Sequence, residues 1–318
     1  IKSYSDHAKI QTFTTTGIGL PSVCNLALAH AAGEYIIRLD GDDILDENAL
    51  QLLSTALDRS PEMGLVFPAY FLVDEHGDVF SQHHRQRDYD GNQRIDLPPN
   101  GACTLIRKNV LDECGGYRTD LGAQDGFDLW AKVRANHKMG NVNLPLFKYR
   151  RHSNNLTNNN PRIMNARRQI KRDAIEQSRG NFGPIIGVIP CRRHFEFIDN
   201  FWCQKIKDIT LLERTINSCL KSTLIDILVV ACDNPEADDY VKKYDDPRLR
   251  FFLRDPKGTA RSKSLLGTVE KIALAYDPEM TGITVVSFCQ APFITAETIE
   301  ETITTLLFND TDSAFGVE

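Results

Sequence analysis

The chain has 318 residues, of which 42% are hydrophobic and 25% charged, and its formal net charge is −6. This length suits two domains of about 150 residues each, and the composition is that of an ordinary globular protein. The acidic balance argues against nucleic acid as a partner, and no apolar run approaches the roughly 18 residues that span a bilayer.

Strand-like segments alternate with helical patterns along the first half of the chain, which is typical of α/β domains with mostly parallel sheets. We predict strands at 10–14, 35–39, 64–73, 102–106 and 144–149. We predict helices at 21–32, 47–57, 108–114, 125–135 and 162–178. The helix 47–57 has Leu50, Leu53 and Leu57 on its apolar face. The polar segment 74–97 is expected to form a hairpin and then a surface loop that carries binding groups.

The segment Gly180–Pro184 breaks this pattern, so we place a domain boundary there, between residues 1–180 and 184–318. The basic helix 162–179 forms the linker; we expect a solvated face, with a membrane surface or a lipid diphosphate as the alternative ligand. The alternation then restarts. Strands are predicted at 185–189, 225–231, 249–253, 283–288 and 313–318, and helices at 210–220, 235–243, 262–276 and 296–308.

The acidic cluster Asp40-Gly41-Asp42-Asp43 directly follows the predicted strand 35–39. Ligands bind at the carboxyl ends of strands in open α/β sheets. Three carboxylates in four residues repel one another unless a cation or many donors neutralise them, and Mg²⁺ and Mn²⁺ take oxygen ligands that they share with substrate phosphates. The cluster is therefore a candidate metal site at a diphosphate. A solvated turn whose Asp43 or Asp46 caps the next helix is the alternative.

Three sets of motifs in this half carry a family resemblance. First, a turn with Gly19, a helix with Asn25, Gly33-Glu34-Tyr35, a strand and Asp40-x-Asp42 follow one another. Second, Gly115-Gly116-Tyr117 precedes Gln124-Asp125 and a helix with Trp130. Third, the segment ends in Tyr149-Arg150-Arg151-His152. In order and spacing these motifs resemble the family 2 glycosyltransferases of the GT-A fold.

The chain departs from that family at two places, since Val23-Cys24 stands where the family has Ala-Arg, and Gln124 where it has Glu. The first departure puts a donor contact in doubt. The resemblance also implies that strands of the first domain precede Ile1, and that some donor-binding residues lie there.

The resemblance implies transfer of a sugar, with inversion, from a nucleoside-diphosphate sugar to the hydroxyl of a glycan or lipid-linked acceptor, with Mn²⁺ or Mg²⁺ as cofactor. Asp40 and Asp42 are the expected metal ligands; His152 is a metal ligand or a diphosphate contact, or else a surface histidine. Asp125 is the expected base, kept ionised by the helix dipole, with a helix cap as the alternative. Asp128 is expected to be a surface or supporting carboxylate. The residues expected to contact donor or acceptor are Gly19, Asn25, Asp43, Gly101 and Trp130.

The second half opens with Gly187-Val188-Ile189-Pro190-Cys191-Arg192-Arg193, and Thr210–Ile216 and Gln290-Ala291-Pro292-Phe293 follow. These segments resemble sugar cytidylyltransferases of the acylneuraminate and spore-coat polysaccharide types, with the C-terminal part absent. The resemblance implies a nucleotide site with Arg192, Arg193 and Gln290. The family's Gly-rich phosphate loop is replaced here by residues 194–197, and Phe201 stands at the position of its catalytic lysine. The aromatic residues Phe195, Phe197, Phe201 and Trp202 are expected to line a pocket or an interface.

Two alternatives to a bacterial surface-polysaccharide glycosyltransferase stay open. One is a sugar cytidylyltransferase with an accessory sugar-binding domain, and the other is a non-catalytic nucleotide-binding scaffold. The eight cysteines form no C-x-x-C pair, so we expect buried free thiols and a cytoplasmic protein, with the inner face of the membrane as the alternative location. A homodimer and a peripheral contact with a membrane are compatible with the sequence.

Overall fold

The structure is a computed structural model that describes residues 7–83, 101–153, 155, 160–195, 198–255 and 264–316. The chain divides into two compact units, unit 1 at residues 1–170 and unit 2 at 171–318. The division falls inside helix α5 (Asn160–Ser178), ahead of the Gly180–Pro184 break in the sequence pattern. Part of the predicted binding loop, residues 84–97, lies outside the described residues.

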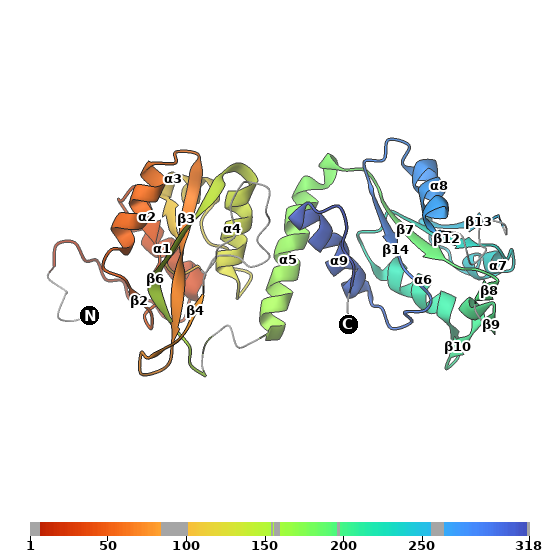
Figure 1. The fold of residues 1–318 in the computed structure, drawn as a ribbon, viewed down its shortest axis with the longest axis horizontal. Helices are drawn as coiled ribbons and strands as arrows, with labels where there is room; N and C mark the ends of the chain where they lie inside the picture. Colours follow the sequence, from red (N-terminus) through yellow and green to blue (C-terminus); the bar gives the residue numbers. More distant parts are fainter. Residues whose placement is uncertain are drawn as a thin grey trace. The chain divides into compact units, whose positions relative to one another are not determined.

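Unit 1 is built on one sheet, in which the strands follow the order β1-β5-β3-β6-β2 and β4 pairs with β3. Its strands are β1 (Tyr35–Ile37), β2 (Ile44–Leu45), β3 (Met63–Val73), β4 (Val79–His83), β5 (Leu105–Arg107) and β6 (Lys138–Arg150). Its helices, besides the first part of α5, are α1 (Leu20–His30), α2 (Ala49–Asp58), α3 (Lys108–Glu113) and α4 (Asp125–Asn136). α2 packs on β3 and β6 and α4 on β6, and Figure 1 shows these helices on opposite sides of the strands.

The pairing in this sheet follows from the length of the connections. β3 and β6 are parallel, because two helices separate them along the chain. β4 is antiparallel to β3, because only the tight turn 74–78 joins them. Asp74 holds that turn by accepting backbone N–H groups of His76 and Asp78, both at 2.9 Å. The predicted hairpin is confirmed, as is the α/β class with parallel pairing, although β1, β2 and β5 pair antiparallel.

Two details of unit 1 differ from the sequence prediction. Residues 10–14 form no strand and are exposed, because no described strand lies beside them to complete a ladder. In α2, Ala49 is buried with Leu53 and Leu57, whereas Leu50 is 51% exposed. Leu53 and Leu57 therefore lie on the buried face as predicted, and Ala49 takes the place expected for Leu50.

Unit 2 contains a parallel sheet of four strands in the order β13-β12-β7-β14. These strands are β7 (Ile185–Pro190), β12 (Ile227–Cys232), β13 (Leu249–Leu253) and β14 (Ile283–Val286). Two hairpins, β8 (His194–Phe195) with β9 (Ile198–Asp199) and β10 (Lys205–Ile206) with β11 (Ile209–Thr210), lie between β7 and α6 along the chain. The helices are α6 (Leu211–Lys221), α7 (Ala237–Val241), α8 (Leu266–Tyr276) and α9 (Ala296–Asn309), with short 3₁₀ helices η3 (Arg179–Asn181) and η4 (Phe201–Cys203).

Alternation along β7 divides the core of unit 2 between two helical layers. Ile185 and Ile189 pack with α6 and α9, while Ile186 and Val188 pack with Ile272 of α8. Figure 1 shows α6 and α9 on one side of the sheet and α8 on the other. A strand buried on both faces reads as a continuous apolar run, and Ile185–Pro190 has that pattern.

Three expectations for unit 2 and its linker need comment. Residues 313–316 are irregular and largely exposed, so the predicted last strand is wrong there, and 317–318 lie outside the described residues. The basic α5 is only partly a solvated face, because Lys171 bonds to Glu301 and Thr305 and Arg172 pairs with Glu300. Among the described residues, none of the helices combines the length and apolar character needed to cross a membrane.

Candidate active site

The acidic loop after β1 is fixed against the end of β6. Asp43 is buried, and its Oδ1 accepts the backbone N–H of Arg150 at 3.0 Å. The Arg150 Nε donates to the carbonyl of Asp42 at 3.0 Å. Burial raises the pKa of Asp43 to about 6, although the Arg150 hydrogen bond opposes this shift. Asp43 therefore supports the loop from the protein side, while Asp40 and Asp42 remain on its more exposed side.

Arg38 links the acidic loop to the start of α4. Its Nε lies 2.9 Å from Oδ1 of Asp40, and its Nη1 pairs with Oδ2 of Asp125. The guanidinium side chain is only 14% exposed. Burial would lower its pKa, but the two carboxylates outweigh burial and raise the pKa above the ordinary value. One fixed cation thus neutralises two carboxylates that the sequence places far apart.

Gly101 makes room for this cation. A Cβ built on Gly101 would lie 2.9 Å from Nη2 of Arg38 and 3.1 Å from Cζ, closer than ordinary contacts allow. The predicted acceptor-side residue Gly101 therefore lies at the site, where it permits close approach of the guanidinium.

Asp125 is the first residue of α4 and does not cap that helix. The preceding Gln124 adopts a left-handed conformation with φ of 63°, and no side chain caps the α4 N-terminus by hydrogen bonding. The carboxylate is turned toward Arg38 instead. Asp128, one turn further on, is buried and pairs with Lys132 at 2.8 Å. Burial raises the pKa of Asp128 despite that pair, and the ion pair gives this residue a supporting role in the packing of α4.

Asp42 and His152 meet on the other side of the loop. Nε2 of His152 lies 3.0 Å from Oδ2 of Asp42, and both side chains are partly exposed. Within the described residues no group of three or more acidic, histidine or cysteine side chains gathers to hold a metal by itself. Asp42 and His152 supply two converging donors, which fits a cation that completes its shell with substrate oxygens and water. Asp40 is held by Arg38 rather than joined to this pair.

The remaining predicted contacts differ in their surroundings. Gly19 is exposed at the N-cap of α1 with φ of 84°. Asn25 uses its amide on the backbone of Tyr117, donating to its carbonyl at 2.7 Å and accepting its N–H at 2.9 Å, so it fixes the Gly115-Gly116-Tyr117 turn. Trp130 is 1% exposed and stacks on Phe127. The Trp130 ring therefore packs in the core of unit 1, and its contact with a donor or acceptor stays a prediction.

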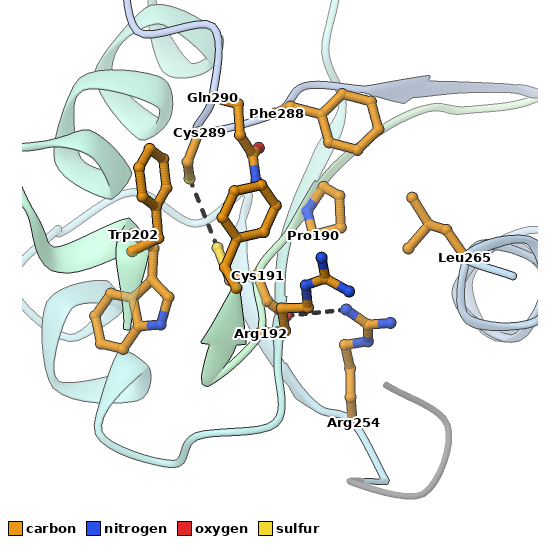
Figure 2. Close-up of a pocket in the computed structure, with 11 residues that line it drawn as sticks. Pro190, Cys191, Arg192, Trp202, Arg254, Leu265, Phe288, Cys289 and Gln290 are labelled. Atoms are coloured by element: carbon orange, nitrogen blue, oxygen red, sulfur yellow. Dashed lines mark hydrogen bonds between the residues drawn. The ribbon is translucent and has the colours of Figure 1, made fainter. Parts of the chain in front are cut away.

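Unit 2 has a cavity of about 170 Å³ at the carboxyl ends of β7 and β14, lined by the residues shown in Figure 2. Arg192 and Gln290, two of the predicted nucleotide contacts, line it, whereas Arg193 is not among the lining residues. Phe195, Phe201 and Trp202 also line it, as the sequence predicted for a pocket, and Phe197 lies outside the described residues. The guanidinium of Arg192 stacks over the ring of Phe195 at 4.9 Å.

Arg254 is the residue of this cavity that sequence reasoning missed. It is 7% exposed, donates Nη1 to the carbonyl of Cys191 at 2.9 Å, and forms no ion pair within the described part of the chain. Its Nε is buried and has no hydrogen-bond partner among the described residues, and burial lowers its pKa. Burying this cation costs free energy that the attraction of Asp233 offsets only in part, so an anionic ligand would stabilise Arg254 further. The sequence signal for Arg254 is its position directly after strand 249–253. The corresponding signal for Arg38 is its position two residues before the acidic cluster.

Comparison with known proteins assigns the two halves separately. Residues 1–166 match the family model described as glycosyltransferase like family 2, and residues 188–317 match the model described as cytidylyltransferase. Both resemblances drawn from the motifs are thereby confirmed. A curated relative, an uncharacterized glycosyltransferase of Rickettsia bellii (strain RML369-C), is 25% identical over 166 residues. That alignment covers 51% of this chain but only 24% of the relative, so the chain spans about a quarter of the relative's length.

Solved structures similar to this chain include three nucleotidyltransferases. CMP:2-keto-3-deoxy-manno-octonic acid synthetase complexed with CTP is 13% identical, with a TM-score of 0.34 over 40% of this chain and 49% of that one. The 4-diphosphocytidyl-2C-methyl-D-erythritol synthase of Anaerococcus prevotii DSM 20548 is 21% identical, with a TM-score of 0.30 over 39% and 51%. A cytidylyltransferase of Leptospira borgpetersenii serovar Hardjo-bovis (strain JB197) is 15% identical, with a TM-score of 0.32 over 39% and 49%.

Proposed function

The chain belongs to the glycosyltransferase like family 2, and on that premise we propose that unit 1 transfers a sugar, with inversion, from a nucleoside-diphosphate sugar to an acceptor hydroxyl. We propose a glycan or a lipid-linked glycan as the acceptor, in the synthesis of bacterial surface polysaccharide. The supporting observation is that Arg38 joins the Asp-x-Asp motif to Asp125 across the sheet, so that the metal-type carboxylates and the candidate base lie at one site.

In this proposal Asp125 is the general base. Arg38 holds its Oδ2, so Oδ1 is available to accept the proton of the acceptor hydroxyl as the oxygen attacks the anomeric carbon. The ion pair fixes the carboxylate in one orientation, which favours a positioned base over a mobile one. Attack opposite the leaving diphosphate inverts the anomeric centre.

The residues that would hold Mn²⁺ or Mg²⁺ are Asp42 and His152, with Asp40 next to them. A divalent cation bound there would neutralise the negative charge that develops on the leaving diphosphate. The buried Asp43 and the Arg150 hydrogen bonds hold the loop that carries these ligands. The chain itself therefore contributes ligand placement, a fixed base and a cation, Arg38, close to both.

The test is nucleotide release from a panel of UDP-, GDP-, dTDP- and CMP-sugars with Mn²⁺, Mg²⁺ or EDTA, with and without acceptor glycans. We expect release from one nucleoside-diphosphate sugar, lost with EDTA and in Asp42→Ala, and retained in a surface control, Asp120→Ala. Absence of release from every donor under every condition would contradict the transferase and favour the scaffold alternative.

A second activity is favoured by the buried Arg254, and we propose that unit 2 binds a cytidine nucleotide. The cavity is smaller than the roughly 300–1,000 Å³ of a complete ligand site, so it suits one part of a nucleotide, with the remainder outside. Titration calorimetry with CTP, CMP, UTP and ATP tests this directly. Binding selective for the cytidine nucleotides supports the proposal, and incubation with CTP and sugar acids then decides between a CMP-sugar-forming enzyme and a binding module.

A further inference from the structure

Two cysteines from the loops that follow β7 and β14 meet at the wall of the unit 2 cavity. Sγ of Cys191 lies 3.6 Å from Sγ of Cys289, and the side chains are 5% and 2% exposed. Both residues line the cavity, and Figure 2 shows their sulfur atoms turned toward each other. If the two thiols only filled space in the core, nothing would explain why both border a cavity with room for several water-sized molecules.

The strand register brings this pair together. Val188 of β7 pairs with Val286 of β14 in the parallel ladder, and Ser287 N–H bonds to the carbonyl of Val188 at 2.9 Å. Cys191 and Cys289 each follow these paired valines by three residues. Forming the S–S bond shortens the present 3.6 Å between the two sulfur atoms to roughly 2.05 Å.

The two thiols are not equivalent. The hydrogen bond to Cys289 and burial raise the pKa of Cys191. Donation from the Cys191 thiol outweighs burial at Cys289 and lowers its pKa. Because the thiolate is the reactive form, Cys289 is the better nucleophile of the pair and Cys191 the residue that resolves it.

We propose that Cys191 and Cys289 form an oxidisable dithiol that hydrogen peroxide converts to a disulfide inside the unit 2 cavity. The Cys289 thiolate attacks one peroxide oxygen, the O–O bond breaks, and the departing hydroxide takes up the thiol proton as water, leaving a sulfenic acid. The Cys191 sulfur, losing its own proton, then attacks the Cys289 sulfur and displaces the second oxygen as water. Two thiols and one peroxide give one disulfide and two waters, and a thiol reductant reverses the oxidation.

The disulfide has a consequence for ligand binding, which rests on the proposed nucleotide site. Cys191 and Cys289 line the same cavity as Arg254, so a disulfide between them would change the shape of the cavity wall beside the buried guanidinium. Oxidation should therefore weaken binding of CTP by at least tenfold. By reciprocal linkage, a saturating concentration of CTP should slow formation of the disulfide.

The experiment maps thiols in the full chain after graded hydrogen peroxide, using one alkylating reagent before reduction by dithiothreitol and a second after it. The expected result is a reducible cross-link between the peptides of Cys191 and Cys289, absent from Cys191→Ser and Cys289→Ser. In Cys191→Ser, dimedone should label Cys289. The control Cys114→Ser, in unit 1, should keep the cross-link. Cysteines 191 and 289 that stay alkylatable, or that become irreversibly oxidised without a cross-link, would overturn the proposal.

Calorimetry with CTP on the reduced and oxidised chain separates the two proposals. If reduced protein does not bind CTP, the nucleotide site is wrong while the peptide map still decides the dithiol. If both forms bind CTP equally, the cross-link exists without control of the site, and the regulatory part is overturned.

Discussion

The two units place their candidate sites at the carboxyl ends of strands but build them from opposite chemistry. In unit 1 the carboxylates of Asp40 and Asp125 are neutralised by one internal cation, Arg38. In unit 2 the cavity contains Arg192 and the buried Arg254 among aromatic rings and thiols, and none of the described residues that line it is acidic. In both units the sheet determines only where the candidate site lies. The loops at the strand ends determine whether acidic or basic side chains gather there.

The helix starts differ in the same way. In α6 of unit 2, Thr210 and Glu213 form a complete capping box, so the local sequence satisfies the helix N-terminus. In α4 of unit 1, Asp125 stands at the helix start without capping it and pairs with a distant arginine. The carboxylate of Asp125 therefore does not serve the N-terminus of α4, which supports a catalytic role for this residue.

The largest expected effect separates the two sites by activity. Asp125→Asn should reduce sugar transfer by about 10²- to 10⁴-fold, since a general base contributes on that scale, and should leave CTP binding to unit 2 unchanged. Steady-state kinetics with the donor identified by the panel measure the loss. Asp120→Asn, an exposed aspartate of the same unit, is the matched control; an equal loss in both variants would argue against Asp125 as the base.

Removing the cation of unit 2 should have the converse effect. Arg254→Met should weaken CTP binding by about 1.5–3 kcal/mol, or roughly 10- to 150-fold, through loss of charge-assisted hydrogen bonds. It should also raise the unfolding free energy of the ligand-free protein, because the cost of burying this charge outweighs the attraction of Asp233. Calorimetry and urea denaturation measure these changes. Arg250→Met, which changes an exposed residue of the preceding strand β13, should do neither.

The metal ligands of unit 1 can be tested without loss of the base. Loss of a group that only supports a metal ligand weakens metal binding roughly 10- to 100-fold. His152→Gln should raise the Mn²⁺ concentration needed for half-maximal transfer by at least that much. The control is His137→Gln, whose imidazole also faces a carboxylate, Glu113 at 3.2 Å, away from the site. An unchanged Mn²⁺ requirement in His152→Gln would remove this residue from the metal site.

Gly101→Ala tests whether the position of Arg38 matters. The added Cβ must displace a guanidinium that two carboxylates hold, so transfer should fall about tenfold, in line with the roughly 1–3 kcal/mol of an overpacked site. Gly180→Ala adds its Cβ in open space and should be neutral. Full activity in Gly101→Ala would show that Arg38 can move without consequence.

The smallest effect concerns the capped helix of unit 2. Thr210→Ala should cost about 1 kcal/mol of stability.

Burial would raise the pKa of Glu213, but hydrogen bonds from Thr210 and the Lys243 ammonium lower it below its usual 4.5. A depressed folded-state pKa gives stability above the unfolded value that is lost as pH falls through the folded one. The difference in unfolding free energy between wild type and Glu213→Gln should therefore shrink from about pH 6 to about pH 3; a constant difference would contradict it.

The sequence by itself determined the two α/β halves and most helix and strand locations, and it predicted Asp42, Asp125 and His152 as site residues, because periodicity and motif spacing are local properties of the chain. The predictions of strands at 10–14 and 313–316 are wrong, because a strand also needs a neighbouring strand, which no local pattern supplies. Only the tertiary structure decided that Arg38 bridges Asp40 and Asp125, that Trp130 is core, that Arg254 is buried without an ion pair, and that Cys191 meets Cys289. Each of these depends on contacts between residues far apart along the chain, and packing alone fixes which side chains share a low-dielectric space.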